Sequence, residues 1–147
     1  MEKINLQSKT KAEKGIAEKY WFENSDIGLS NTLFHRICIP LTPFDSGLEY
    51  ESQPVETEIV IEWLNLKLQN PDELNNLTIT SQAYEELEAS VYIGGAHNMC
   101  DVKRLEITKK ENDNYLVKGE LLIDFQSEGV GENEAFNFQT EVNYQKD

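Results

Sequence analysis

Apolar and polar residues alternate with a period of two along most of this chain, and this alternation predicts β-strands. The first such run covers residues 33–39 and is ended by Pro40. The longest covers residues 57–68, and its apolar parity changes between Trp63 and Leu64. Because side chains on a strand alternate between faces, the change predicts a β-bulge near Trp63–Leu64 or a strand buried on both faces.

Five further segments have a β-like pattern and are separated by turn-forming residues. They are residues 77–79, 87–93, 105–107, 115–125 and 136–144. Residues 81–88 also fit a helical period, but the alternation favours a strand that ends before Gly94-Gly95. The last three runs predict consecutive antiparallel strands, joined by a polar turn at 109–114 and a Gly-rich acidic loop at 128–134.

The N-terminal region shows a helical period instead. Thr10 and Glu13 have the spacing of a capping box, in which a hydroxyl and a carboxylate bind the amides at a helix start. The residues that then share one helical face are Ala12, Ile16, Ala17, Tyr20 and Trp21. We therefore predict an amphipathic helix over residues 11–22, which Gly15 disfavours by about 1 kcal/mol.

These elements indicate one domain over residues 1–147, with a helix at about 11–22 and a β-rich part at 33–145. A chain of this length buries enough surface to hold a core without disulfide bonds. About seven or eight short strands, without alternating helices, are typical of a mainly β fold. We expect an antiparallel β-sandwich or curled sheet, with the N-terminal helix packed on one face or closing one end.

The formal net charge is −14, and it is unevenly distributed. Residues 21–100 contain thirteen acidic side chains and only two basic ones, Arg36 and Lys67. Such a surface repels nucleic acid and anionic membranes and attracts basic partners, so we expect binding to neither of the first two. The N-terminus lacks the apolar region of a signal peptide, and no apolar run reaches the ~20 residues of a membrane span. We therefore expect a cytoplasmic protein.

Both histidines and both cysteines occur in His-x-x-Cys pairs, His35 with Cys38 and His97 with Cys100. Two imidazoles and two thiolates can form a tetrahedral zinc site. On a strand, however, positions three apart point to opposite faces, so the first pair shares a metal only if its strand breaks. The second pair follows Gly94-Gly95 in a predicted loop. The simpler interpretation is a packed Cys38, a half-buried His35 and an exposed His97, and we expect no cofactor.

Acidic residues gather in three places. Glu56, Glu58 and Glu62 share one parity and mark a predicted solvent face. The other two runs supply the candidate partner-binding residues, which are Glu85, Glu86 and Glu88, and Asp124, Glu128, Glu132 and Glu134. The last run offers oxygen ligands for calcium without the EF-hand spacing, and a solvated hairpin loop is the alternative. Crowding of like charges destabilises a fold, so its presence here indicates that the acidic surface has a function.

The sequence contains no recognisable catalytic or nucleotide-binding motif, so we expect a protein that is not an enzyme. A small, acidic, β-rich chain of this kind resembles the bacterial immunity proteins of contact-dependent growth inhibition and related polymorphic toxin systems. The resemblance implies binding to a cognate basic toxin domain, often a nuclease, whose active site the acidic side chains would occlude. Tyr50, Tyr84 and Tyr92 are candidate anchors. The alternative is a ligand- or metal-binding β-sandwich domain without catalytic activity.

Overall fold

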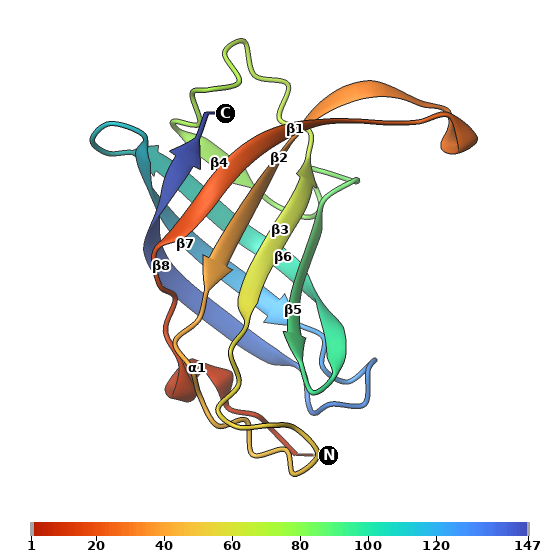
Figure 1. Ribbon diagram of the computed structural model, residues 1–147, viewed down its shortest axis with the longest axis vertical. Helices are drawn as coiled ribbons and strands as arrows, with labels where there is room; N and C mark the ends of the chain where they lie inside the picture. Colours follow the sequence, from red (N-terminus) through yellow and green to blue (C-terminus); the bar gives the residue numbers. More distant parts are fainter. Residues whose placement is uncertain (1, 147) are drawn as a thin grey trace.

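The computed structural model describes residues 2–146, which form eight strands and two short helical segments (Figure 1). Their bounds in chain order are α1 Leu6–Lys9, β1 Gly15–Asn24, the 3-10 helix η1 Ser25–Ile27, β2 Leu29–Pro40, β3 Glu58–Leu64, β4 Leu77–Ile79, β5 Glu88–Ile93, β6 Ala96–Lys109, β7 Asn114–Ile123 and β8 Glu134–Gln145. In the part of the chain described, no helix has the length and apolar character that crossing a membrane requires.

The sheet curls until it closes into a barrel. Seven strands form a ring in the order β6-β5-β3-β2-β1-β8-β7, and pairing between β6 and β7 completes it. The ring contacts are antiparallel except for the parallel pairing of β1 with β8. The predicted mainly β fold is confirmed, but the predicted sandwich is wrong. Closure depends on the 14-residue β6, which pairs with β5 and then β4 along one edge and with β7 along the other.

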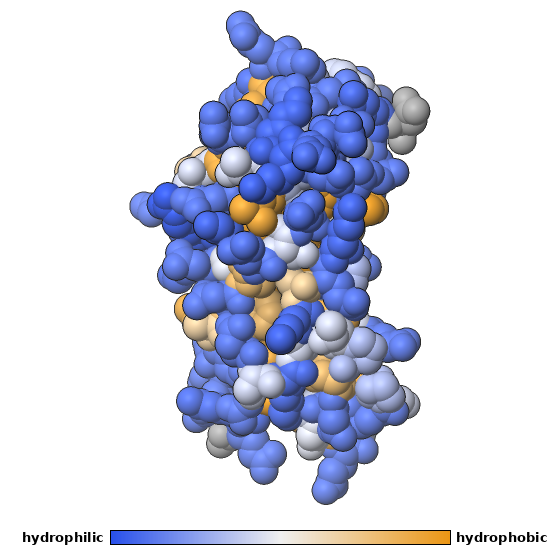
Figure 2. Space-filling model, turned by 90° about the vertical axis from the view of Figure 1, so that its left-hand side faces the viewer, coloured by the Kyte–Doolittle hydropathy of each residue, from blue (hydrophilic) through white to orange (hydrophobic). Residues whose placement is uncertain are grey.

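Alternate residues of the strands point into the barrel and form one core. On β7, for example, Tyr115 and Val117 are buried between more exposed neighbours. The N-terminal segment closes one end of the barrel, where Ile4 and Leu6 join the core and donate their backbone amides to the Glu134 carboxylate at 2.8 Å. Outside, hydrophilic side chains dominate, and apolar surface gathers near the middle of the face shown in Figure 2.

Residues 11–22 do not form the predicted helix. The helix before them is α1, which has four residues, and the β-rich part begins at Gly15 rather than at residue 33. Ala17 is buried while Ile16 is exposed, which is the period of a strand. Thr10 does not cap a helix, because its hydroxyl donates to the carbonyl of Thr42 at 2.6 Å. The local apolar pattern fits both a helix and a strand, and the pairing of β1 with β2 and β8 decides for the strand.

The predicted bulge in the long strand is confirmed. Pairing between β2 and β3 skips from His35↔Leu64 to Ile37↔Ile61, so β3 contains one residue more than β2 over this interval. The extra length is taken up at Trp63, whose φ of 60° lies in the left-handed region. Its indole ring packs edge-on against nearby rings of β1 and β2, which are those of Tyr20, Phe22 and Phe34.

The predicted strand at 87–93 is confirmed as β5, and Gly94-Gly95 forms the turn that follows it. Residues 97–100, predicted to lie in a loop, instead belong to β6. The reason is that the turn needs only the two glycines, both of which have a positive φ, and residues 97–100 then pair directly with β5.

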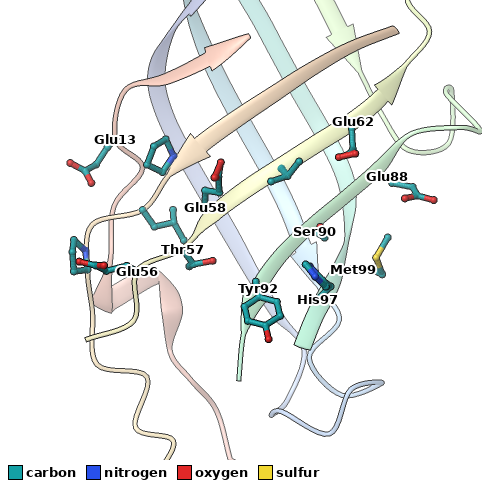
Figure 3. Close-up of a pocket in the computed structure, with 14 residues that line it drawn as sticks. Glu13, Glu56, Thr57, Glu58, Glu62, Glu88, Ser90, Tyr92, His97 and Met99 are labelled. Carbon is teal, nitrogen blue, oxygen red and sulfur yellow. The ribbon is translucent and has the colours of Figure 1, made fainter. Parts of the chain in front are cut away.

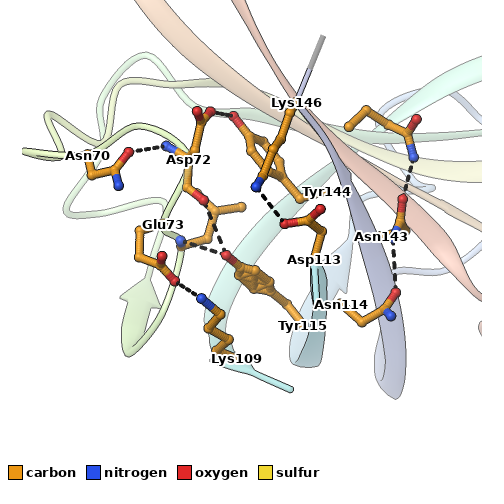
Figure 4. A network of polar contacts seen from close by, with 12 residues as sticks. Asn70, Asp72, Glu73, Lys109, Asp113, Asn114, Tyr115, Asn143, Tyr144 and Lys146 are labelled. Atoms are coloured by element: carbon orange, nitrogen blue, oxygen red, sulfur yellow. Dashed lines mark hydrogen bonds and ion pairs between the residues drawn. The ribbon is translucent and has the colours of Figure 1, made fainter. Parts of the chain in front are cut away.

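The loop between β3 and β4 closes the other end of the barrel through a polar network (Figure 4). The Asp72 carboxylate accepts hydrogen bonds from Lys19 Nζ at 2.5 Å and from the Tyr144 hydroxyl at 2.7 Å. The bonds from Lys19 and Tyr144 lower the pKa of Asp72, and burial and the Asp72 carboxylate raise that of Tyr144. His35 Nε2 lies 2.8 Å from the Pro71 carbonyl oxygen, and burial lowers the pKa of this imidazole.

Candidate functional site: an acidic groove on the barrel

A groove of about 860 Å³ crosses the outer face of the barrel over β3, β5 and the start of β6 (Figure 3). Its side chains are there because of strand alternation. Ile59 and Ile61 point into the core, so Glu58, Val60 and Glu62 point outward. The segments before β1 and β3, together with the end of β2 and the residues just after it, supply the rest of one wall.

Carboxylates surround the groove. Five glutamates line it, which are Glu13, Glu56, Glu58, Glu62 and Glu88. The lining contains neither lysine nor arginine, and none of the ion pairs among residues 2–146 involves these glutamates. The groove therefore carries a negative charge that no ion pair within the described residues neutralises, and the concave shape concentrates its field.

Two of these glutamates oppose each other directly. Glu62 on β3 and Glu88 on β5 are register partners in an antiparallel pair. Like charges in that position destabilise a sheet, with cross-strand pairs contributing about 0.2–1 kcal/mol. This is the one register pair of two carboxylates in the described sheet.

The floor and one rim of the groove are apolar. Val60 and Pro40 contribute aliphatic surface, and Tyr92 and Met99 are 49% and 47% exposed at the β5–β6 side. The Tyr92 ring packs edge-on against His97, with 4.7 Å between the ring centroids. Exposed apolar side chains framed by charges are a common feature of protein-binding surfaces.

Arg36, a cation on the neighbouring strand β2, is already engaged in an ion pair. Arg36 on β2 donates two hydrogen bonds to Glu18, at 2.9 and 2.6 Å, and its guanidinium lies 5.0 Å from the centre of the Tyr20 ring. The bond with Glu18 raises the pKa of Arg36 further. Arg36 therefore pairs with Glu18, and its interaction with the groove residue Glu62 is a smaller contribution to its pKa, without an ion-pair contact.

Neither cysteine has the lowered thiol pKa of a reactive nucleophile. Burial, with the nearby Glu58 charge, raises the pKa of Cys38 to about 11, and burial raises that of Cys100 to about 12. Both thiols therefore stay protonated near neutral pH.

The four candidate zinc ligands point in different directions. His35 and Cys100 are buried on the inner side of their strands, while Cys38 and His97 lie on the outer side. Within residues 2–146, no group of three or more His, Cys, Asp or Glu side chains is arranged to hold a metal ion. The strand geometry that separates His35 from Cys38 also separates the second pair, because residues 97–100 are a strand.

The first predicted acidic run is divided by the structure. Glu88 lines the groove, whereas Glu85 and Glu86 are exposed on the turn before β5. The candidate anchors also differ, since Tyr50 and Tyr92 are exposed and Tyr84 packs partly against the core. Among the glutamates of the groove, Glu56, Glu58 and Glu62 were recognisable from their shared parity. Glu13 was not, because it belongs to the segment predicted to be a helix.

The second predicted run lies at the end of the barrel closed by the N-terminal segment, and most of its carboxylates have partners within the chain. Asp124 accepts hydrogen bonds from the backbone and hydroxyl of Ser127, which lower its pKa. Glu132 forms an ion pair with Lys3 at 3.8 Å, and Glu134 holds the N-terminal amides. Glu128 is exposed. These bonds organise the loop and the N-terminal segment.

Comparison of the chain with protein-family models, curated proteins and solved structures found no match.

Proposed function

We propose that this protein binds and neutralises a basic protein partner, and that the acidic groove is the contact surface. The observation that carries the proposal is the register pair Glu62↔Glu88. Two opposed carboxylates destabilise the free protein. A lysine or arginine of a partner placed between them would remove the repulsion and form charge-assisted hydrogen bonds with both.

The groove offers the two components that tight protein contacts need. Its glutamates steer a basic partner and accept hydrogen bonds from its cations. Tyr92 and Met99 supply apolar surface that can be desolvated in the complex. A ligand-binding barrel is a weaker alternative, because side chains from the ring strands and both ends form one packed core.

An inhibitory role follows from the same chemistry. A nuclease holds phosphate groups with lysine and arginine, and those cations are the ones that the groove would engage. The bound protein would then exclude nucleic acid from the active site. This mode of action is that of toxin immunity proteins, the class that the sequence resembles, and we propose it for this chain.

Affinity capture with the tagged protein tests the proposal at low and moderate salt. The matched variants are Glu62→Gln/Glu88→Gln, which removes the opposed pair and leaves three of the five groove glutamates, and Glu111→Gln/Glu141→Gln, which removes the same charge elsewhere. We expect a basic protein that is retained by the wild type and by the second variant, is lost with the first, and dissociates as salt rises. The captured protein should lose its enzymatic activity when the wild type is added. Equal retention by both variants would exclude the groove as the contact surface.

A further inference from the structure

The β1–β2 hairpin continues beyond the barrel as a two-stranded arm, formed by Lys19–Asn24 of β1, η1 and Leu29–Phe34 of β2 (Figure 1). Among the described residues, the two strand segments pair with each other and with no third strand. Trp21 and Ile27 on the arm are 64% and 72% exposed. A two-stranded ribbon is marginally stable in water, and an unpaired strand edge is a template for another strand.

The free edge of β2 begins at the bulge in β3. His35 is the last residue of β2, toward the arm, that pairs with β3, and its partner is Leu64. Because Trp63 adopts a left-handed conformation, β3 ends at Leu64 and the chain continues into the loop before β4 instead of following the arm. The backbone groups along Leu29–Leu33 therefore have β1 on one side only.

This edge lacks the features that usually protect an open strand. Its sequence, Leu-Ser-Asn-Thr-Leu-Phe over residues 29–34, contains no charge and no proline. Lysines, prolines and very short edge strands are the common safeguards. The edge strand β4 is protected by its length, because it has only three residues. The β2 edge is twice as long and open to pairing.

We propose that two copies of this chain pair through their β2 edges, antiparallel about a two-fold axis near Asn31. The arms then form one four-stranded sheet. The pairing sets Leu29 of one copy opposite Leu33 of the second copy. Trp21 is already the register partner of Leu33 within its own arm, so an apolar row extends across the seam. A two-stranded ribbon is only marginally stable in water, whereas a sheet of three or more strands can be stable. The arm therefore gains stability when it pairs with the arm of a second copy.

Electrostatics places the contact at the arm. The whole chain has a net charge of −14, so two copies repel each other over most of their surface. Residues 20–34 contain only two charged side chains, Glu23 and Asp26, and neither lies on β2. Repulsion is therefore weakest where the two β2 edges meet. Since salt screens the remaining repulsion, the dimer strengthens as salt rises, whereas a complex with a basic protein weakens.

Analytical ultracentrifugation of the full chain at rising protein concentration, in low and high salt, tests this proposal. We expect a monomer–dimer equilibrium whose dissociation constant falls with salt. The interface is small, so the dimer should be weak and should appear toward the high end of the concentration range. A monomer throughout the range, or a dimer that dissociates in high salt, would overturn the proposal.

Two matched pairs of variants locate the contact. Asn31→Lys and Asn31→Glu each bring like charges together at the axis and should both raise the dimer dissociation constant, by about fivefold or more. Gln139→Lys and Gln139→Glu change the net charge equally at an exposed position of β8 that pairs with Lys118 of β7 and lies outside the arm, and should leave the dissociation constant close to that of the wild type. Thermal unfolding of each variant checks that it is folded.

The outcomes also separate this proposal from the proposed function. Asn31 variants that dimerise like the wild type would exclude the β2 edge, whatever the groove binds. A wild-type dimer that captures no basic protein would support the arm contact and count against the groove. Neither result depends on the other, because the arm and the groove share no residue.

Discussion

The β6–β7 and β3–β5 strand pairs both place charged side chains in register on the outer face of the barrel, but they use them differently. On β6–β7, Arg104 faces Glu120 and Glu106 faces Lys118. On β3–β5, Glu62 faces Glu88. The first arrangement sets opposite charges against each other, and the second sets like charges against each other, which a cation from a partner would relieve. This difference is the basis for proposing the β3–β5 face as the contact surface.

A second contrast involves carboxylates at the end of the barrel. Asp72 lies between Lys19 and Tyr144 and helps to hold the loop in place. The glutamates of the groove have no such donors among the ion pairs of residues 2–146. Removing Asp72 or its donors should therefore affect stability, whereas removing a groove glutamate should affect binding.

The largest expected effect is on binding. Reversing three charges in the groove, by Glu58→Lys, Glu62→Lys and Glu88→Lys, should weaken the complex with the captured basic protein by about 2–5 kcal/mol, because cations then face cations. Isothermal titration calorimetry measures the change. The control triple variant, Glu111→Lys, Glu128→Lys and Glu141→Lys, has the same net charge and should retain most of the affinity. Equal losses in the two variants would show that only net charge matters.

The polar network should respond in stability. Tyr144→Phe removes the hydroxyl that donates to Asp72, leaving a partly buried carboxylate with one donor fewer, and should lower the free energy of unfolding by about 1–2 kcal/mol. Urea unfolding gives this value. Tyr92→Phe removes a hydroxyl for which no hydrogen bond is found among residues 2–146, on an exposed ring, and serves as the control. A Tyr144→Phe variant as stable as the wild type would contradict the role of the network.

Single charge reversals test the two register pairs against each other. Glu88→Lys places a cation opposite Glu62 and should raise the free energy of unfolding by about 0.2–1 kcal/mol. Glu120→Lys places a cation opposite Arg104 and should lower it by a similar amount. Urea unfolding of both variants at low salt decides this. A shift of both variants in the same direction would show that the opposed charges of these register pairs do not determine stability.

The smallest expected effect is a pH dependence from His35. Burial holds its pKa below the ordinary 6.5 in the folded state, so the unfolded chain binds a proton first as the pH falls. Its contribution to stability is complete above pH 6.5 and is lost as the pH decreases from there toward the folded-state pKa. Urea midpoints between pH 7.5 and 5.5 should fall more for the wild type than for His35→Gln. His97→Gln, at an exposed position, should behave like the wild type.

Most strands could be predicted because their alternation is local. The bulge near Trp63, the short β4, the β5 strand, the end of β6 and the last two strands all follow from residues that lie next to one another in the chain, whereas the start of β6 was predicted to be a loop. The segment at 11–22 could not be assigned in this way. Its apolar residues fit both a strand and a helix, and contacts with β2 and β8 decide between them.

The candidate site could be predicted only in part. The shared parity of Glu56, Glu58 and Glu62 indicates an outward face, and the −14 net charge indicates a preference for basic partners. Neither shows that Glu88 comes to lie beside Glu62 while Glu85 and Glu86 do not. Strands β3 and β5 are separated by more than twenty residues, so their register depends on pairing across the sheet rather than on local pattern.

The sequence by itself determined where most of the strands and turns lie and that the surface is acidic, because alternation, glycine turns and charge are properties of neighbouring residues. Tertiary structure alone decided that residues 15–24 form a strand, that β6 closes the sheet into a barrel, and that two glutamates from different strands oppose each other. Those outcomes depend on hydrogen bonding between distant segments, whose free energy exceeds the local preference of any one segment.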